Sequence, residues 1–261
     1  GAVWGAQFGL EVPNYFAQNG EPDFETPSFR RSNAWDAVKR EVKAVRRSVG
    51  INEVHNFSKF LVSGAHARAW LDRIMAGRIP QAGRLSLTPM LSPKGKLIGD
   101  FTVSCIREGL FQLTASYGSQ AYTQRWFEQN MEPGVTLQNI SDQRTGFQIA
   151  GPKAAEVLQA CTTANVADIK FLDVTELVVG ATACLVQQVS YTGDHGFELY
   201  CDPMAQRALW DRLWEAGKPH GMTPFGMRAM MSLRLDRFFG SWLSEFSPDY
   251  TAAETGLDRS Q

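Results

Sequence analysis

The apolar positions of this chain repeat with two different periods, which predicts a mixture of helices and strands. Between residues 35 and 49 apolar side chains recur every three or four positions, as on one face of a helix. We predict that Ser32 or Asn33 caps this helix and that Gly50 ends it. Residues 1–31 are rich in glycine, proline and aromatic residues, which is typical of an irregular arm.

Short apolar runs, some continuous and some alternating, predict strands through the rest of the chain. We expect strands at residues 57–63, 84–91, 97–106, 110–115, 147–150, 174–179, 183–189 and 197–201. We expect further helices at residues 64–74, 120–130, 153–160, 204–216 and 224–235. No glycine-rich phosphate loop opens a strand–helix–strand unit. This mixed order of elements indicates an α+β fold.

Composition narrows the possible partners. The 261 residues carry 26 basic and 27 acidic side chains, so the net charge of -1 offers no footprint for nucleic acid or an anionic membrane. No apolar run approaches the roughly 20 residues that span a bilayer, and no signal peptide is visible. The four cysteines and four histidines are scattered, which favours no metal site. Cys105 and Cys184 read as reduced core residues, which suits the cytoplasm or the mitochondrial matrix.

Charged side chains inside apolar segments mark three clusters where chemistry could occur. Asp100 precedes a strand-like run, and a carboxylate there must be solvated, hydrogen-bonded or paired. It is either a structural aspartate at a strand edge or a reactive acid. Glu198 lies between Phe197 and Leu199 and therefore faces away from them, either as an exposed residue or as a ligand contact. Arg228, in an apolar helix, needs an anionic partner from the protein or a ligand.

In their order and spacing, these clusters resemble the glycine-cleavage T-protein (aminomethyltransferase) family. They look most like the folate-binding regions fused to flavin-dependent dimethylglycine and sarcosine dehydrogenases. The resemblance is carried by residues 87–95, 99–100, 190–193, 196–198, 224–229 and 232–235. Residues 1–5, 26–32, 239–242 and 249–258 look like the dehydrogenase-fused branch.

The resemblance implies a T-protein-like folate-binding fold with two α+β lobes. Residues 1–54 and 141–245 would form the first lobe, and residues 55–140 would form an inserted second lobe. Residues 246–261 would begin a linker to a C-terminal β-barrel lobe that is absent from this chain.

The resemblance also implies an activity, the capture of a methylene unit by tetrahydrofolate. The unit would come from an oxidised N-methyl amine of the dimethylglycine or sarcosine type, as an iminium ion or formaldehyde, and give 5,10-methylenetetrahydrofolate. Asp100 matches the catalytic acid/base, Glu198 the pterin-holding carboxylate and Arg228 the arginine at the folate tail. Tyr191 and Ser116 are weaker candidates for the pocket wall. FAD would belong to an upstream flavin domain that is not present in this chain.

One departure from the family pattern keeps other functions open. Leu87 stands where the family usually has a tyrosine, thirteen residues before the catalytic aspartate. A folate-dependent methyltransferase acting on a methylated sulfonium or amine is one alternative. A non-catalytic folate-binding module is another.

Overall fold

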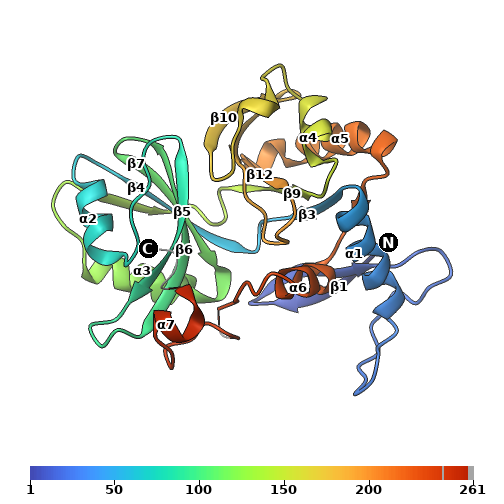
Figure 1. Ribbon diagram of the computed structural model, residues 1–261, viewed down its shortest axis with the longest axis horizontal. Helices are drawn as coiled ribbons and strands as arrows, with labels where there is room; N and C mark the ends of the chain where they lie inside the picture. Colours follow the sequence, from blue (N-terminus) through green and yellow to red (C-terminus); the bar gives the residue numbers. More distant parts are fainter. Residues whose placement is uncertain (243, 258–261) are drawn as a thin grey trace. The chain divides into compact units, whose positions relative to one another are not determined.

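The computed structural model describes residues 1–242 and 244–257, which fold into two compact units (Figure 1). Unit 1 contains residues 1–56, 145–171 and 176–239. Unit 2 contains residues 57–144, 172–175 and the described residues from 240 onward. The predicted α+β fold class is confirmed, and among the described residues no sheet closes into a barrel.

Unit 1 is built on a six-stranded sheet. Its strands, in spatial order, are β10 (Val174–Val179), β11 (Thr182–Gln187), β12 (Gly196–Cys201), β9 (Thr145–Ala150), β3 (Gly50–Glu53) and β13 (Thr223–Pro224). The strands from β11 to β3 pair antiparallel, and the short β13 runs parallel to β3. The sheet therefore has two faces along which alternate residues of each strand project.

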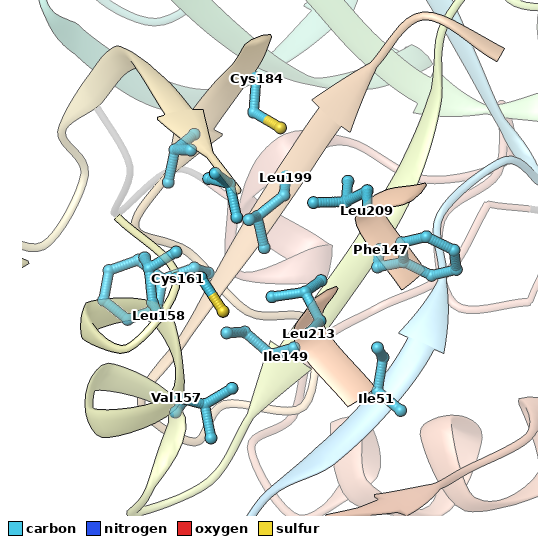
Figure 2. Close-up of a cluster of buried hydrophobic side chains, with 14 of the residues drawn as sticks. Ile51, Phe147, Ile149, Val157, Leu158, Cys161, Cys184, Leu199, Leu209 and Leu213 are labelled. Atoms are coloured by element: carbon cyan, nitrogen blue, oxygen red, sulfur yellow. The ribbon is translucent and has the colours of Figure 1, made fainter. Parts of the chain in front are cut away.

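One face of this sheet carries the core of unit 1. Phe147 and Ile149 of β9 lie beside Leu199 of β12 in a single buried cluster (Figure 2). Phe197 of β12, opposite Ile149, belongs to the same cluster. Helices α4 (Ala154–Gln159) and α5 (Gln206–Gly217) cover this face with the side chains Val157, Leu158, Leu209 and Leu213. The side chains between these core positions consequently point to the opposite face.

The opposite face is partly covered by two other helices. Helices α1 (Trp35–Arg47) and α6 (Met227–Leu235) bury Val45, Phe225 and Ala229 against Ala150 at the end of β9. Ala150 has the same parity along β9 as Gln148, so this helical layer lies on the face that the core does not use.

The N-terminal residues form a hairpin rather than the predicted irregular arm. Strands β1 (Ala2–Gln7) and β2 (Leu10–Phe16) pair antiparallel through a two-residue turn. Both turn residues, Phe8 and Gly9, have positive φ angles of 53° and 85°. Hairpin turns of this kind usually carry asparagine or aspartate before glycine, so Phe8 gave no turn signal in the sequence.

Unit 2 is built on a five-stranded antiparallel sheet. Its strands, in spatial order, are β5 (Arg84–Leu91), β6 (Leu97–Arg107), β7 (Leu110–Ser116), β4 (Phe57–Ser63) and β8 (Thr136–Asn139). Helices α2 (Ala67–Ile74) and α3 (Gln120–Gln129) pack on one face of this sheet (Figure 1). The ring of Phe127 in α3 contacts Trp70 of α2 and both Phe60 and Phe101 of the sheet. The last described helix is α7 (Ala252–Thr255). The described residues also form short 3-10 helices at Tyr117–Ser119, Val166–Asp168, Pro203–Ala205 and Lys218–His220.

The other predicted elements are present, with differences at their ends. The cap prediction is wrong, because Ala34 precedes α1 without a capping side chain and Asn33 instead accepts a bond from Thr26. Gly50 does not end the helix; it begins the unpredicted strand β3. The helix predicted from residue 224 starts at Met227, because residues 223–224 pair with β3.

Candidate functional site

Asp100 lies in the middle of β6, not at a strand edge. It is opposite Pro89 of β5, and the alternation of β6 places it on the same face as Thr102. Phe101 and Val103 point the other way, into the core of unit 2. Burial raises the pKa of the Asp100 carboxyl from 3.8 to about 6. The carboxyl therefore changes its charge close to neutral pH, as a proton-transferring group must.

The residues around Asp100 on this face are largely polar. Thr102 is opposite Thr114 of β7, and Ser104 is opposite Gln112. Thr114, Ser104 and Gln112 are buried although they face away from the core. Their side-chain polar atoms have no hydrogen-bond partner within the described residues. Unpaired buried polar groups are rare in folded proteins, so this face has the character of a binding surface.

Leu87 and Ser116 belong to the same face. Leu87 of β5 is opposite Thr102. It lies two residues before Pro89, which is opposite Asp100. Its side chain is 47% exposed, which is unusual for a leucine within a sheet. Ser116, at the end of β7, shares its face with Thr114 by alternation. Unit 2 therefore brings three of the residues singled out in the sequence to one surface.

In unit 1, Glu198 occupies the centre of β12. Phe197 and Leu199 are in the core and Glu198 is on the opposite face, so the predicted orientation is confirmed. The hydroxyl of Tyr200 donates a 2.7 Å hydrogen bond to Glu198 Oε2. On the two adjacent strands, Gln148 and Gln187 lie directly opposite Glu198. Neither glutamine was predicted as a site residue, although Gln148 stands between the apolar residues Phe147 and Ile149 in the sequence.

Tyr191 lies in the loop that leads into β12. Its ring packs against the cluster formed by α1, α6 and Ala150, and it stacks on Phe239 with 6.3 Å between ring centroids. The loop is held by a 2.8 Å ion pair between Asp194 and Arg46 of α1. Tyr191 and Glu198 are thus associated with the same face of the sheet in unit 1.

Arg228 projects from the start of α6 and forms an ion pair within unit 1. Its Nη2 lies 3.0 Å from Glu25 Oε2, which confirms the interpretation of an internal salt bridge. The Arg228 side chain is 55% exposed and that of Glu25 is 18% exposed. Both residues line a pocket of about 620 Å³ that also includes Asp23 and Arg30. The pocket contains charges of both signs and is therefore suited to a ligand with both polar donors and acceptors.

A buried carboxylate fixes the start of α6. Glu41 of α1 accepts backbone hydrogen bonds from Phe16 at 2.6 Å and from Gly226 at 2.9 Å. Burial raises the pKa of Glu41 from 4.5 to about 7. A Cβ on Gly226 would lie 2.3 Å from the carbonyl oxygen of Asn14, so only glycine fits there. These contacts position the first turn of α6, which carries Arg228.

The described residues contain neither a metal-ligating cluster nor an exposed cysteine. Within residues 1–242 and 244–257, no group of three or more histidine, cysteine or acidic side chains could hold a metal ion. The four cysteines are buried and none of them forms a disulfide within the described residues, and burial raises the pKa of Cys184 to about 12. The prediction that Cys105 and Cys184 are core residues is confirmed. In the same ranges, no helix is long and apolar enough to cross a membrane.

The sequence of this chain matches a known protein family and several of its members. The GCVT N-terminal domain matches residues 1–260. The chain belongs to this family. Rat (Rattus norvegicus) mitochondrial dimethylglycine dehydrogenase is 35% identical over 259 residues, which cover 97% of this chain and 30% of that protein. An aminomethyltransferase of Natranaerobius thermophilus is 29% identical, covering 84% of this chain and 60% of that protein.

Solved structures place this GCVT-family chain in the same fold. The glycine cleavage system aminomethyltransferase T from Bartonella henselae matches with a TM-score of 0.81 at 21% identity, over 97% of this chain and 63% of that chain. The heterotetrameric sarcosine oxidase from Corynebacterium sp. U-96 matches with a TM-score of 0.55 at 18% identity, over 74% of this chain and 97% of that chain. The chain spans under a third of the length of the dimethylglycine dehydrogenase that it matches.

Proposed function

We propose that this GCVT-family chain binds tetrahydrofolate and transfers a one-carbon unit to it. The observation that carries the proposal is Asp100, a carboxyl with a pKa raised to about 6 on a polar sheet face. Proton transfer is efficient when the pKa of the acid or base lies near the working pH. The dimethylglycine dehydrogenase and aminomethyltransferase relatives support the same chemistry.

In the proposed reaction, a ring nitrogen of tetrahydrofolate attacks the carbon of an iminium ion and forms a carbon–nitrogen bond. The attacking nitrogen loses its proton, and the amine leaves after gaining a proton. A second folate nitrogen then closes on the same carbon and loses its own proton, which gives 5,10-methylenetetrahydrofolate. The Asp100 carboxylate would accept and return these protons, and its negative charge would stabilise the cationic intermediate.

The residues of unit 1 are proposed to hold the folate. The pterin edge presents an amino group and a ring N–H side by side, which a carboxylate such as Glu198 accepts together. The carboxylates of the folate tail suit the guanidinium of Arg228, which would exchange Glu25 for the ligand. We also propose folate contacts for Tyr191 of unit 1 and for Ser116 of unit 2.

We further propose that the iminium ion comes from an N-methyl amine of the dimethylglycine or sarcosine type. An upstream flavin domain or subunit carrying FAD would oxidise that amine. The dimethylglycine dehydrogenase and sarcosine oxidase matches support this assignment. Passing the electrophile directly to folate would keep it from water.

The test uses the protein in its full natural length with dimethylglycine or sarcosine and tetrahydrofolate. The proposal expects 5,10-methylenetetrahydrofolate to form in step with amine oxidation. Methyltetrahydrofolate formed without oxidation would instead establish a methyltransferase.

A non-catalytic folate-binding module is the second candidate, and Leu87 favours it. This residue lies on the face that carries Asp100 and supplies no hydroxyl. Folate binding without any one-carbon product would establish this candidate, and restoration of turnover by Leu87→Tyr would identify the missing hydroxyl as the cause.

A further inference from the structure

Four polar residues form a continuous row across the sheet of unit 1. Gln187 of β11 is opposite Glu198 of β12, which is opposite Gln148 of β9, which in turn is opposite Asn52 of β3. Directly opposed side chains in an antiparallel sheet have Cβ atoms about 5 Å apart. All four project from the face opposite to the apolar core, because the residue before each of them in its strand belongs to that core.

Two members of this row are closed off from solvent and unpaired. Gln148 and Gln187 each have 0% of their surface exposed. Neither the amide nitrogen nor the amide oxygen of either residue has a hydrogen-bond partner among residues 1–242 and 244–257. A buried amide without partners destabilises a fold. Two such amides on both sides of one carboxylate therefore indicate partners that arrive with a ligand.

The fourth member ties the row to α6. The side-chain amide of Asn52 donates a 2.6 Å hydrogen bond to the carbonyl oxygen of Phe225, immediately before the first turn of α6. Its carbonyl oxygen has no partner within the described residues. The row is consequently anchored at one end, while Gln148 and Gln187 offer unpaired donors and acceptors.

The chemistry of this centre is more specific than that of Glu198 alone. A carboxylate only accepts hydrogen bonds, whereas a glutamine amide offers two donor hydrogens and a carbonyl acceptor. A 2-amino-4-oxopyrimidine edge, such as the pterin edge of folate, presents amino and N–H donors beside a carbonyl acceptor. Glu198 satisfies only the donors, so an adjacent amide is needed for the carbonyl.

We propose that Gln148 and Gln187 are ligand-binding residues that recognise the pyrimidine edge of the pterin together with Glu198. The inference rests on the proposed folate function and adds two specificity residues to it. One amide donates to the ring carbonyl, and the other accepts the second hydrogen of the ring amino group. The unpaired amides destabilise the ligand-free fold and become paired on binding.

The test replaces each glutamine with methionine, which has a similar length and no strong polar group. Gln148→Met and Gln187→Met are compared with the unaltered protein in its full natural length. Calorimetric titration with tetrahydrofolate gives Kd, and thermal unfolding without ligand gives Tm. The proposal expects each variant to bind about tenfold more weakly or worse, with a ligand-free Tm that is unchanged or higher.

Thr145→Val is the matched control, because valine keeps the size of threonine and removes its hydroxyl. Thr145 of β9 is also buried, and its hydroxyl has no hydrogen-bond partner within the described residues, but it lies opposite Cys201 rather than beside a carboxylate. We expect an unchanged or raised Tm and a Kd within about twofold of the unaltered protein.

Each contrary result has one meaning. An unchanged Kd in both variants would overturn the inference and leave the folate function standing. A lower ligand-free Tm in both variants would also overturn it, because the amides would then have partners within the fold. A Thr145→Val variant that binds tetrahydrofolate as weakly as the two glutamine variants would show that the loss is not specific to the Glu198 row, which would overturn the inference. Absence of tetrahydrofolate binding by the unaltered protein would overturn the proposed function and this inference with it.

Discussion

Each unit contains a sheet with one apolar and one polar face, but the carboxylates on the two polar faces have different surroundings. In unit 1, Glu198 accepts a hydrogen bond from the hydroxyl of Tyr200 and lies between the side-chain amides of Gln148 and Gln187. In unit 2, Asp100 lies opposite Pro89 and shares its face with Thr102 and Thr114, and burial raises its pKa to about 6. A carboxylate with fixed neighbours is suited to holding a ligand, and one that titrates near neutrality is suited to moving protons. We therefore propose that unit 1 binds the folate and that Asp100 of unit 2 transfers protons.

The largest expected effect comes from removing the titrating carboxyl. Asp100→Asn keeps the size of the side chain but cannot accept a proton, so kcat for methylenetetrahydrofolate formation should fall about 10²- to 10⁴-fold. Single-turnover kinetics with the iminium-generating amine would measure it. If the variant turned over within twofold of the unaltered protein, Asp100 of unit 2 would not be the proton-transferring group.

A smaller effect is expected from the carboxylate in unit 1. Glu198→Gln preserves the shape but replaces a double acceptor with a mixed group, so tetrahydrofolate should bind about 10- to 100-fold more weakly. Its kcat at saturating folate should change less than its Kd. A large loss of kcat with unchanged Kd would reverse the roles of the two units.

The pH dependence of turnover sharpens the comparison. Asp100 has its pKa raised from 3.8 to about 6, so it is a carboxylate above that pH and is protonated below it. If the carboxylate is the base, kcat/KM should fall about tenfold per unit as the pH drops below about 6. The residual activity of Asp100→Asn should not show this fall in kcat/KM below about pH 6. The same fall in the variant would mean that another group, not Asp100, is the titrating base.

Stability should depend on pH through Glu41 of unit 1. Its folded pKa of about 7 lies above the unfolded value of 4.5, so the folded state binds more protons between these values. The free energy of unfolding should therefore fall as pH rises from about 4.5 to 7, by roughly 2–3 kcal/mol from this group. Urea unfolding of Glu41→Gln should show a flatter dependence, although Asp100 contributes in the same direction. An unaltered slope in the variant would contradict the assignment.

The smallest effect is expected at the ion pair of Arg228. Glu25→Gln frees the guanidinium for a folate carboxylate, and because the pair is partly exposed, folate affinity should rise only about two- to fivefold. Glu21→Gln is the matched control, since Glu21 pairs with Arg40 at 2.6 Å in the same unit. Equal gains in both variants would indicate a general charge effect.

Much of this arrangement was predictable because strands have a strict two-residue period. The alternation around Glu198 fixed its face, and the strand through Asp100 was expected from its apolar residues. The N-terminal hairpin was missed because its turn residue Phe8 has the wrong chemistry for its φ angle of 53°. The pairing of Glu25 with Arg228 joins residues 203 positions apart, which no local pattern reveals.

The row around Glu198 shows a different limit. Each glutamine looked like an isolated polar residue in its own strand, and only the register of three strands brings them together. The raised pKa of Asp100 likewise depends on its burial in the folded chain. The apolar pattern marked the two carboxylates and the family resemblance suggested their roles, while their surroundings required the fold.

The most direct measurement is the Kd of tetrahydrofolate for Asp100→Asn and Glu198→Gln, determined in parallel by calorimetry on the protein in its full natural length. The division of roles predicts that Asp100→Asn binds within about threefold of the unaltered protein, whereas Glu198→Gln binds at least about tenfold more weakly. Equal losses in both variants, or a loss only in Asp100→Asn, would contradict the assignment of binding to one unit and proton transfer to the other.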